Sequence, residues 1–147
     1  ISLRQATLYG VSPRMRVDLA INLMVLHALS KGKIFIWGGG EQWRPFLHVE
    51  DAADGIVTAA EKYNGDLPVN LGSGYEISIK DLTEMIVNLT GFQGKLAWQT
   101  DKPNGQPRRG LDVSRAKELF GWGAQVPFEE GMERTIEWFK ENRSKIK

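Results

Sequence analysis

The sequence predicts an α/β fold, because short segments rich in β-branched and apolar residues alternate with longer segments of helical periodicity. The 147 residues correspond to about one domain. Hydrophobic residues make up 41% and charged residues 25%, as in an ordinary globular chain. The alternation argues against a helical bundle or a β-sandwich, and the sequence contains no internal repeat.

The first half of the chain predicts the order strand, helix, strand, strand, helix. The strands are expected over 1–9, 34–37 and 44–49. The helices are expected over 16–30 and from Glu50-Asp51 until Asn64-Gly65 closes the second one. The helix over 16–30 is apolar on nearly all sides, so we expect it to be largely buried. Asn22 is a polar side chain within it and therefore needs a hydrogen-bond partner. Gly38-Gly39-Gly40 separates two strands and predicts a hairpin turn.

The second half continues the alternation. A strand over 69–72 is followed by Ser78 and Asp81, a capping-box variant that predicts a helix ending at Gly91. A strand over 95–99 leads into a polar loop over 101–110, and Asp112 is expected to cap a short helix. The last helix is predicted over 128–142.

Charge and composition exclude several classes of function. Lys and Arg total 19 and Asp and Glu total 18, and the formal net charge of +1 gives no reason to expect nucleic acid or a membrane surface as partner. The absence of cysteine excludes thiolate nucleophiles and cysteine-based metal sites, and the two histidines argue against a metal centre. No apolar run approaches the roughly 18 residues that cross a bilayer, and we expect a cytoplasmic protein.

Complete catalytic motifs are absent from the sequence. Gly91 and Gly94 belong to the nearest match to a dinucleotide-binding glycine fingerprint, but this match follows a helix and precedes a strand, the reverse of the required order. No Tyr is followed four residues later by Lys, and the sequence has neither a nucleophile elbow nor a P-loop. We therefore predict no catalytic residue in this chain. His48 next to Glu50 is interpreted as a structural hydrogen-bonding residue rather than a metal ligand.

Cationic residues at the edges of the predicted elements favour an anion as ligand. Arg44 follows Trp43 at the start of a strand, and Lys102, Arg108 and Arg109 lie in the loop over 101–110. Guanidinium groups bind phosphate oxygens in pairs, so this set could hold a diphosphate. The alternative is that each is an ordinary surface charge. Trp37 at a strand end is interpreted as a core residue, with a base-stacking platform as the alternative.

Five segments, in order, resemble the NAD-dependent epimerase/dehydratase family, the extended short-chain dehydrogenases that act on nucleotide sugars. They are LRQATLYG at 3–10, IWGGGEQWRPFLHVEDAA at 36–53, VNLGSG with ISI at 69–79, KPNGQPRRGLD at 102–112, and FGW at 120–122 with the stretch 131–138. Each motif alone is short, and the specificity comes from five in sequence. The resemblance implies the C-terminal, substrate-binding part of a Rossmann-type protein, with 1–15 and 66–74 completing the parallel sheet of an N-terminal half. The chain opens without Met inside an expected strand, which also favours a C-terminal part, although a trimmed tag is the alternative.

The resemblance also implies roles for particular residues. Gln5 and Ala6 match positions beside the nicotinamide of NAD or NADP. The matches to the nucleotide-diphosphate sugar are Thr7, Asn22, Ile36, Trp37, Arg44, Lys102 and Arg108. Thr7 stands where the family usually has Asn, which leaves its role open. The family's Tyr-x-x-x-Lys and glycine fingerprint are expected upstream, and many members are homodimers.

Three functions follow as hypotheses. The first is the substrate-binding half of an NAD(P)-dependent nucleotide-sugar epimerase, dehydratase or reductase, an enzyme only as part of the longer protein. The second is a family relative without catalysis that acts as a binding module. The third is a related reductase whose substrate is not a nucleotide. An upstream Tyr-x-x-x-Lys separates the first two, and binding of nucleoside diphosphates separates the third.

Overall fold

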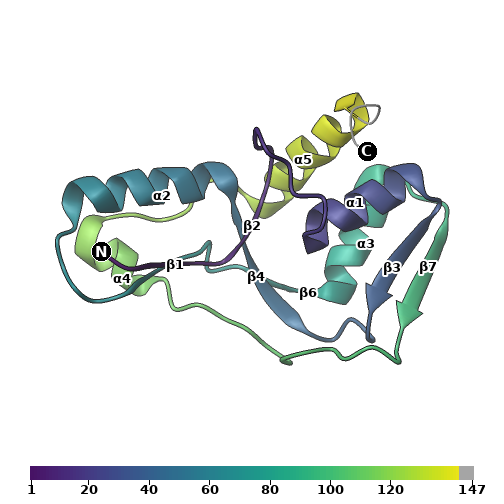
Figure 1. Cartoon of the computed structure of the whole chain (residues 1–147), viewed down its shortest axis with the longest axis horizontal. Helices are drawn as coiled ribbons and strands as arrows, with labels where there is room; N and C mark the ends of the chain where they lie inside the picture. The colour runs from purple at the N-terminus through teal and green to yellow at the C-terminus, as the bar shows by residue number, and fades with distance from the viewer. Residues whose placement is uncertain (143–147) are drawn as a thin grey trace.

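The computed structural model describes residues 1–142 and confirms the α/β class, with three small sheets and five helices in that range (Figure 1). The strands are β1 (Leu3–Gln5), β2 (Thr7–Tyr9), β3 (Lys33–Trp37), β4 (Trp43–His48), β5 (Val69–Leu71), β6 (Glu76–Ser78) and β7 (Lys95–Gln99). The helices are α1 (Ala20–Ser30), α2 (Val49–Lys62), α3 (Ile79–Thr90), α4 (Ser114–Phe120) and α5 (Phe128–Asn142). No helix within the described range has the length and apolar character needed to cross a membrane.

The strand expected over 1–9 is two strands in different sheets. β1 pairs in parallel with β5, whereas β2 pairs in parallel with β4, with Thr7 opposite Phe46. Ala6 lies between them, and its N–H donates to the Leu71 carbonyl at 2.9 Å. Figure 1 shows the chain passing from β1, beside α2 and α4, to β2 in the middle of the molecule. The sequence cannot reveal this break, because both halves have the same β-rich composition.

The hairpin predicted at Gly38-Gly39-Gly40 is wrong, because β3 and β4 do not pair with each other. β3 pairs in parallel with β7, and β4 lies between β2 and β6. Gly38 and Gly40 have φ of +72° and +88°, in the left-handed region that glycine adopts without strain, and the turn carries the chain from one sheet to another. Parallel partners are distant in sequence, so a local turn signal cannot identify them.

Helix α1 begins at Ala20, four residues later than expected. The residues before it are extended at Leu19, and Arg16 pairs there with Asp18 at 2.6 Å. The buried face of α1 packs in a cluster with α3, α5 and β3, on the right in Figure 1. A second cluster fills the space between the β1–β5 ladder and helices α2 and α4, on the left. The core therefore has two parts, and β4 contributes to both through Phe46 and Leu47.

The cap residue predicted from the sequence is correct for α3 and one residue too early for α4. The Ser78 hydroxyl accepts from the Asp81 N–H at 3.0 Å and donates to its carboxylate at 2.7 Å, which confirms Ser78 as the cap of α3. The cap position of α4 is Val113 rather than the expected Asp112. The Asp112 carboxylate still accepts from the Ser114 N–H at 2.9 Å, so its side chain turns the chain into the helix from one residue earlier.

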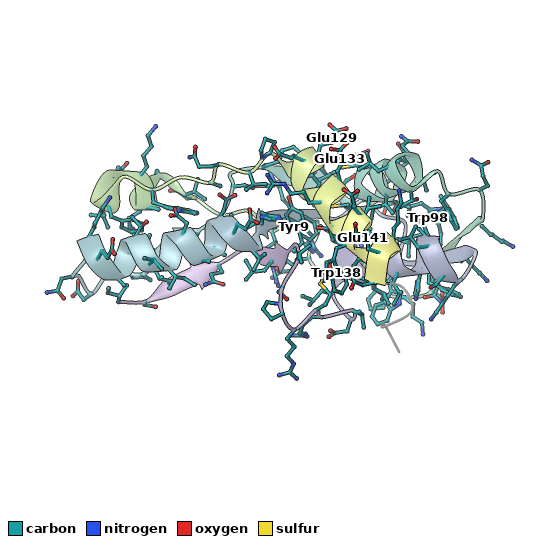
Figure 2. All side chains as sticks on the ribbon, turned by 90° about the horizontal axis from the view of Figure 1, so that it is seen from above. Tyr9, Trp98, Glu129, Glu133, Trp138 and Glu141 are labelled. Atoms are coloured by element: carbon teal, nitrogen blue, oxygen red, sulfur yellow. The ribbon has the colours of Figure 1, made fainter. Side chains whose placement is uncertain are left out.

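Two residues at the start of α2 connect distant parts of the fold. His48 caps the helix by accepting from the Glu50 N–H through Nδ1 at 3.4 Å, as its interpretation as a structural residue predicts. The buried Asp51 carboxylate accepts from the Gln125 and Val126 N–H groups at 2.8 and 3.1 Å. Asp51 thereby fixes the segment between α4 and α5 to the start of α2. Figure 2 shows α5 from above, with Tyr9 on one side of it and Trp98 on the other.

Replacing Asp51 by Asn should lower the free energy of unfolding by about 2 kcal/mol, the scale of losing hydrogen bonds to a charged acceptor. The amide can accept through only one oxygen, so one of the two N–H groups loses its partner. Urea unfolding measures the change. Asp66→Asn is the matched control, because Asp66 is exposed and should change stability little. Equal stabilities of the two variants would contradict this role of Asp51.

Acid should destabilise the fold through His48. Burial lowers the pKa of His48, against the opposing effects of Glu50 and Asp51. The unfolded chain, with a histidine pKa of about 6.5, then binds the proton more tightly than the folded chain. Stability is therefore full above pH 6.5 or so and falls as the pH drops below that value. Burial lowers the pKa of His27 in the same direction.

Melting temperatures at pH 7.5 and 5.5 test this pH dependence. His48→Asn keeps a side chain that caps helices and removes the titrating group, so the drop on acidification should be smaller than in the native chain. His27→Asn serves as a second variant that retains His48. An unchanged drop in His48→Asn would show that other groups cause the acid sensitivity.

Candidate functional site

The loop over residues 101–110 is held against the first residue of β4. The Trp43 N–H donates to the Pro107 carbonyl at 2.9 Å, and the Arg109 N–H donates to the Trp43 carbonyl at 3.2 Å. These bonds make a parallel bridge between Trp43 and Arg108. In Figure 1 the loop runs below β4 and β6 as the green trace between β7 and α4. The cationic residues predicted at 44, 102 and 108 therefore lie along one stretch of the molecule.

The Arg44 guanidinium binds this loop through backbone carbonyls. Its Nη1 donates to Trp43 at 2.7 Å and to Gln106 at 2.8 Å, and its Nη2 donates to Asn104 at 3.3 Å. Partial burial and the positive charge of Arg109 lower the pKa of Arg44, but an arginine stays charged at neutral pH. No carboxylate pairs with Arg44 in the part of the chain that the structure describes. Its positive charge is thus not neutralised by an ion pair.

The Arg108 guanidinium, in contrast, is paired with a carboxylate. Its Nε donates to the Glu76 Oε2 at 2.7 Å, and this ion pair raises the pKa of Arg108. Glu76 lies on β6 opposite Pro45 of β4, in a strand that the sequence analysis did not predict. The only earlier signal for Glu76 was its place inside the family-like stretch 69–79. Lys102 is exposed, and its ammonium has no hydrogen bond or ion pair with any described residue.

The glycine turn after β3 contacts the same loop. The Gly39 N–H donates to the Asn104 Oδ1 at 3.1 Å, and the Asn104 Nδ2 donates to Glu41 at 3.3 Å. A Cβ at Gly38 would collide with the Asn104 side chain, so the close approach requires glycine there. Asn104 was not singled out by the sequence analysis. It joins the end of β3 to the loop that carries Lys102 and Arg108.

Trp37 precedes this turn and is 61% exposed, so its interpretation as a core residue is wrong. β3 alternates, with Ile34 and Ile36 inward and Phe35 and Trp37 outward. Ile36 is 2% exposed and belongs to the core. The exposed indole of Trp37 offers an aromatic surface, whereas Ile36 can contribute only through packing in the core.

The other predicted residues lie along β1, β2 and α1. Gln5 is exposed at the end of β1, Ala6 is buried, and Thr7 opens β2. Asn22 is 3% exposed, and its Nδ2 donates to the Arg16 carbonyl at 2.8 Å. This bond confirms the prediction that Asn22 needs a hydrogen-bond partner. Its Oδ1 has no partner among the described residues. Asn22 is one of the residues that line a cavity of about 240 Å³, together with Tyr9, Arg14 and Arg16, among others.

A second cavity, of about 420 Å³, contains none of the predicted site residues. It is lined by side chains that include Tyr9, Phe46, His48, Tyr75 and Phe128. Burial and the charge of Asp51 raise the pKa of Tyr9, whose hydroxyl donates to the Phe128 carbonyl at 3.2 Å. A tyrosine that stays protonated and is used in this way supports packing rather than proton transfer. Residues 1–142 contain no group of three or more side chains arranged to hold a metal ion.

Comparison with known proteins identifies the family. The model of the NAD dependent epimerase/dehydratase family matches residues 1–72. The probable GDP-L-fucose synthase 1 of Oryza sativa subsp. japonica is 43% identical over 115 residues, which are 78% of this chain and 35% of that protein. This chain belongs to the NAD-dependent epimerase/dehydratase family.

Other members of the family match nearly the whole chain. UDP-glucuronic acid decarboxylase 1 of Xenopus tropicalis is 34% identical over 143 residues, 95% of this chain and 34% of that protein. The structure of UDP-glucuronic acid 4-epimerase from Bacillus cereus, in complex with UDP-glucuronic acid and NAD, has a TM-score of 0.84 at 27% identity. That match covers 95% of this chain and 44% of the epimerase. The chain spans about a third of the length of the curated relatives it matches.

In this family member, replacing Arg44 by Ala should loosen the loop over 101–110. The three carbonyl contacts disappear together, so the Trp43–Pro107 and Arg109–Trp43 bonds should open more often. Hydrogen exchange at the Trp43 and Arg109 amides measures the effect and should become faster. Lys102→Ala is the control, because it removes a cation of the same loop that has no contact with described residues. Unchanged exchange in Arg44→Ala would show that the loop does not depend on Arg44.

Proposed function

We propose that this chain holds the nucleotide diphosphate of a sugar substrate in an NAD(P)-dependent epimerase, dehydratase or reductase. The observation that carries the proposal is Arg44, a partly buried guanidinium without a carboxylate partner among the described residues. It lies beside the loop that also carries Lys102 and Arg108. A diphosphate is recognised by two or three such cations. The family and the ligands named for its solved members support the same assignment.

A GDP-sugar is the substrate class that we favour. The three relatives with 40–43% identity are all named as GDP-L-fucose synthases, one as probable and one as putative, whereas the UDP-glucuronic acid decarboxylase is 34% identical. The exposed indole of Trp37 offers a flat face on which a base can stack. Ile36 lies in the core next to it and would fix the end of β3 from below.

The chain contributes to catalysis by positioning. Binding energy gained at the diphosphate, away from the reacting carbon, holds the sugar in a productive orientation. A bound nicotinamide cofactor would supply hydride transfer. Gln5 and Ala6 would fit beside the nicotinamide ring. The Gln5 carboxamide is exposed and makes no hydrogen bond with described residues, and the small side chain of Ala6 leaves room for the ring. Asn22 would bond the diphosphate of the same substrate, and Thr7 stands in the slot of an Asn that contacts the sugar diphosphate.

The parallel pairing of β1 with β5 is consistent with a larger parallel sheet in the longer protein. Two strands alone make a marginal sheet, and α2 and α4 pack against this one. We infer that β1 and β5, which lie within the predicted segments 1–15 and 66–74, complete the sheet of a dinucleotide-binding half in the longer protein. The homodimer that the resemblance implies stays a prediction.

Calorimetry of the intact protein with GDP, UDP, dTDP and CDP tests the proposal. We expect GDP to bind most tightly. Arg44→Ala should weaken it by about 1.5–3 kcal/mol, the range for hydrogen bonds to charged groups. Arg115→Ala is the matched control, because Arg115 also donates to a backbone carbonyl, that of Pro68, but lies on α4. Equal GDP affinity of the native protein and Arg44→Ala would remove Arg44 from the site.

The remaining outcomes separate the alternative functions. Tighter binding of another nucleotide would keep the site and change the substrate class. Binding of no nucleoside diphosphate would favour a reductase whose substrate is not a nucleotide. Nucleotide binding without any turnover, in a protein that lacks an upstream Tyr-x-x-x-Lys, would favour a binding module.

A further inference from the structure

We propose that Glu76 is a positioning residue, which holds one edge of the Arg108 guanidinium so that the other edge faces the diphosphate. The inference rests on the proposed function and adds a residue to it. Neither the family-like motifs nor the charge pattern of the sequence assigned a role to Glu76. Three groups of contacts around the start of β4 support this role.

The first contact fixes the guanidinium at one atom. The Arg108 Nε donates to the Glu76 Oε2 at 2.7 Å. An arginine has five N–H donors, of which Nε supplies one and the two terminal nitrogens supply four. Neither terminal nitrogen of Arg108 has a hydrogen bond with any described residue, and the side chain is 72% exposed. The terminal edge is therefore open, and this is the edge that can bind two phosphate oxygens at once.

The second set of contacts fixes the backbones of Glu76 and Arg108 to the same strand, β4. Glu76 lies opposite Pro45, and the next two residue pairs of this antiparallel ladder join β6 to Arg44 and Trp43. Arg108 is bridged to Trp43 from the other side. Since β4 carries Arg44, the backbones of Glu76, Arg108 and Arg44 are fixed relative to one another. A free arginine side chain loses rotamer entropy on binding, and prior orientation reduces this loss.

The third contact limits where the Glu76 carboxylate can lie. A Cβ on Gly110 would stand 2.5 Å from the Glu76 Oε1, so the absence of a side chain at 110 leaves room for the carboxylate. The Glu76 side chain is only 18% exposed. Gly110 has no positive φ, so an alanine there would act through this contact rather than through backbone strain.

The two arginines then have different tasks. Glu76 offsets the charge of Arg108. The pair therefore orients hydrogen-bond donors toward the diphosphate more than it adds net electrostatic attraction for it. Arg44, which has no carboxylate partner among residues 1–142, contributes the net positive charge. An ion pair with an exposed partner adds little to stability, so stability alone gives little reason for Glu76 at this position.

Calorimetry of the intact protein with GDP and with guanosine tests the role of Glu76. Glu76→Ala should weaken GDP binding about two- to tenfold, the effect of one oriented hydrogen bond, and should leave guanosine binding unchanged. Glu76→Gln keeps an acceptor oxygen and should restore part of the affinity for GDP. Gly110→Ala keeps both partners and should weaken GDP binding by displacing the carboxylate. In an Arg108→Ala background, Glu76→Ala should have no further effect.

Each other outcome overturns the proposal in a recognisable way. Tighter GDP binding by Glu76→Ala would mean that the carboxylate competes with the diphosphate. An equal loss for GDP and guanosine would mean a structural role, and unchanged binding would mean no role. If Arg108→Ala weakens GDP binding but Glu76→Ala does not, only the role of Glu76 fails. If Arg108→Ala has no effect, the assignment of Arg108 under the proposed function fails with it. Melting temperatures identify a variant that does not fold, in which case Glu76→Gln and Gly110→Ala decide.

Discussion

The arrangement of this molecule depends on the backbone hydrogen bonding of β4. The strand pairs in parallel with β2 on one side and antiparallel with β6 on the other, and its first residue also bonds the loop over 101–110. Phe46 and Leu47 of the same strand contribute to the two parts of the core. Because β4 is fixed at so many points, the side chains at its start are held in place relative to three distant segments of the chain.

This constraint explains how residues far apart in sequence form one candidate site. Arg44 contacts carbonyls 60 and 62 residues later, and Glu76 meets Arg108 across 32 residues. The site is therefore assembled from a strand start, a second strand and a loop. A loop held by a rigid strand is a common place for binding residues, because the scaffold fixes its backbone while its side chains stay accessible. The different roles proposed for the two arginines follow from that geometry: Arg44 supplies net positive charge, and Arg108 supplies oriented hydrogen-bond donors.

The sequence was most informative where the signal is local. Ser78 with Asp81 correctly placed the start of α3, and Gly91 its end, because a cap uses atoms within four residues. It failed at Gly38-Gly39-Gly40, where a local turn signal predicted a hairpin and the true partner of β3 lies more than 50 residues later. Trp37 shows the intermediate case: its strand was predicted correctly, but which face of that strand is buried depends on the packing of α1 and α3.

The sequence by itself determined the α/β class, most element positions and the family, since composition, periodicity and ordered motifs are properties of the chain alone. It also singled out Arg44 and Arg108 as cations at element edges. Only the tertiary structure decided that Arg44 of β4 binds the loop that carries Arg108, that Arg108 is paired with Glu76 and that Arg44 contacts carbonyls instead of a carboxylate. The physical reason is that an ion pair or a β-ladder depends on distances in space, and parallel pairing joins segments that no local pattern relates.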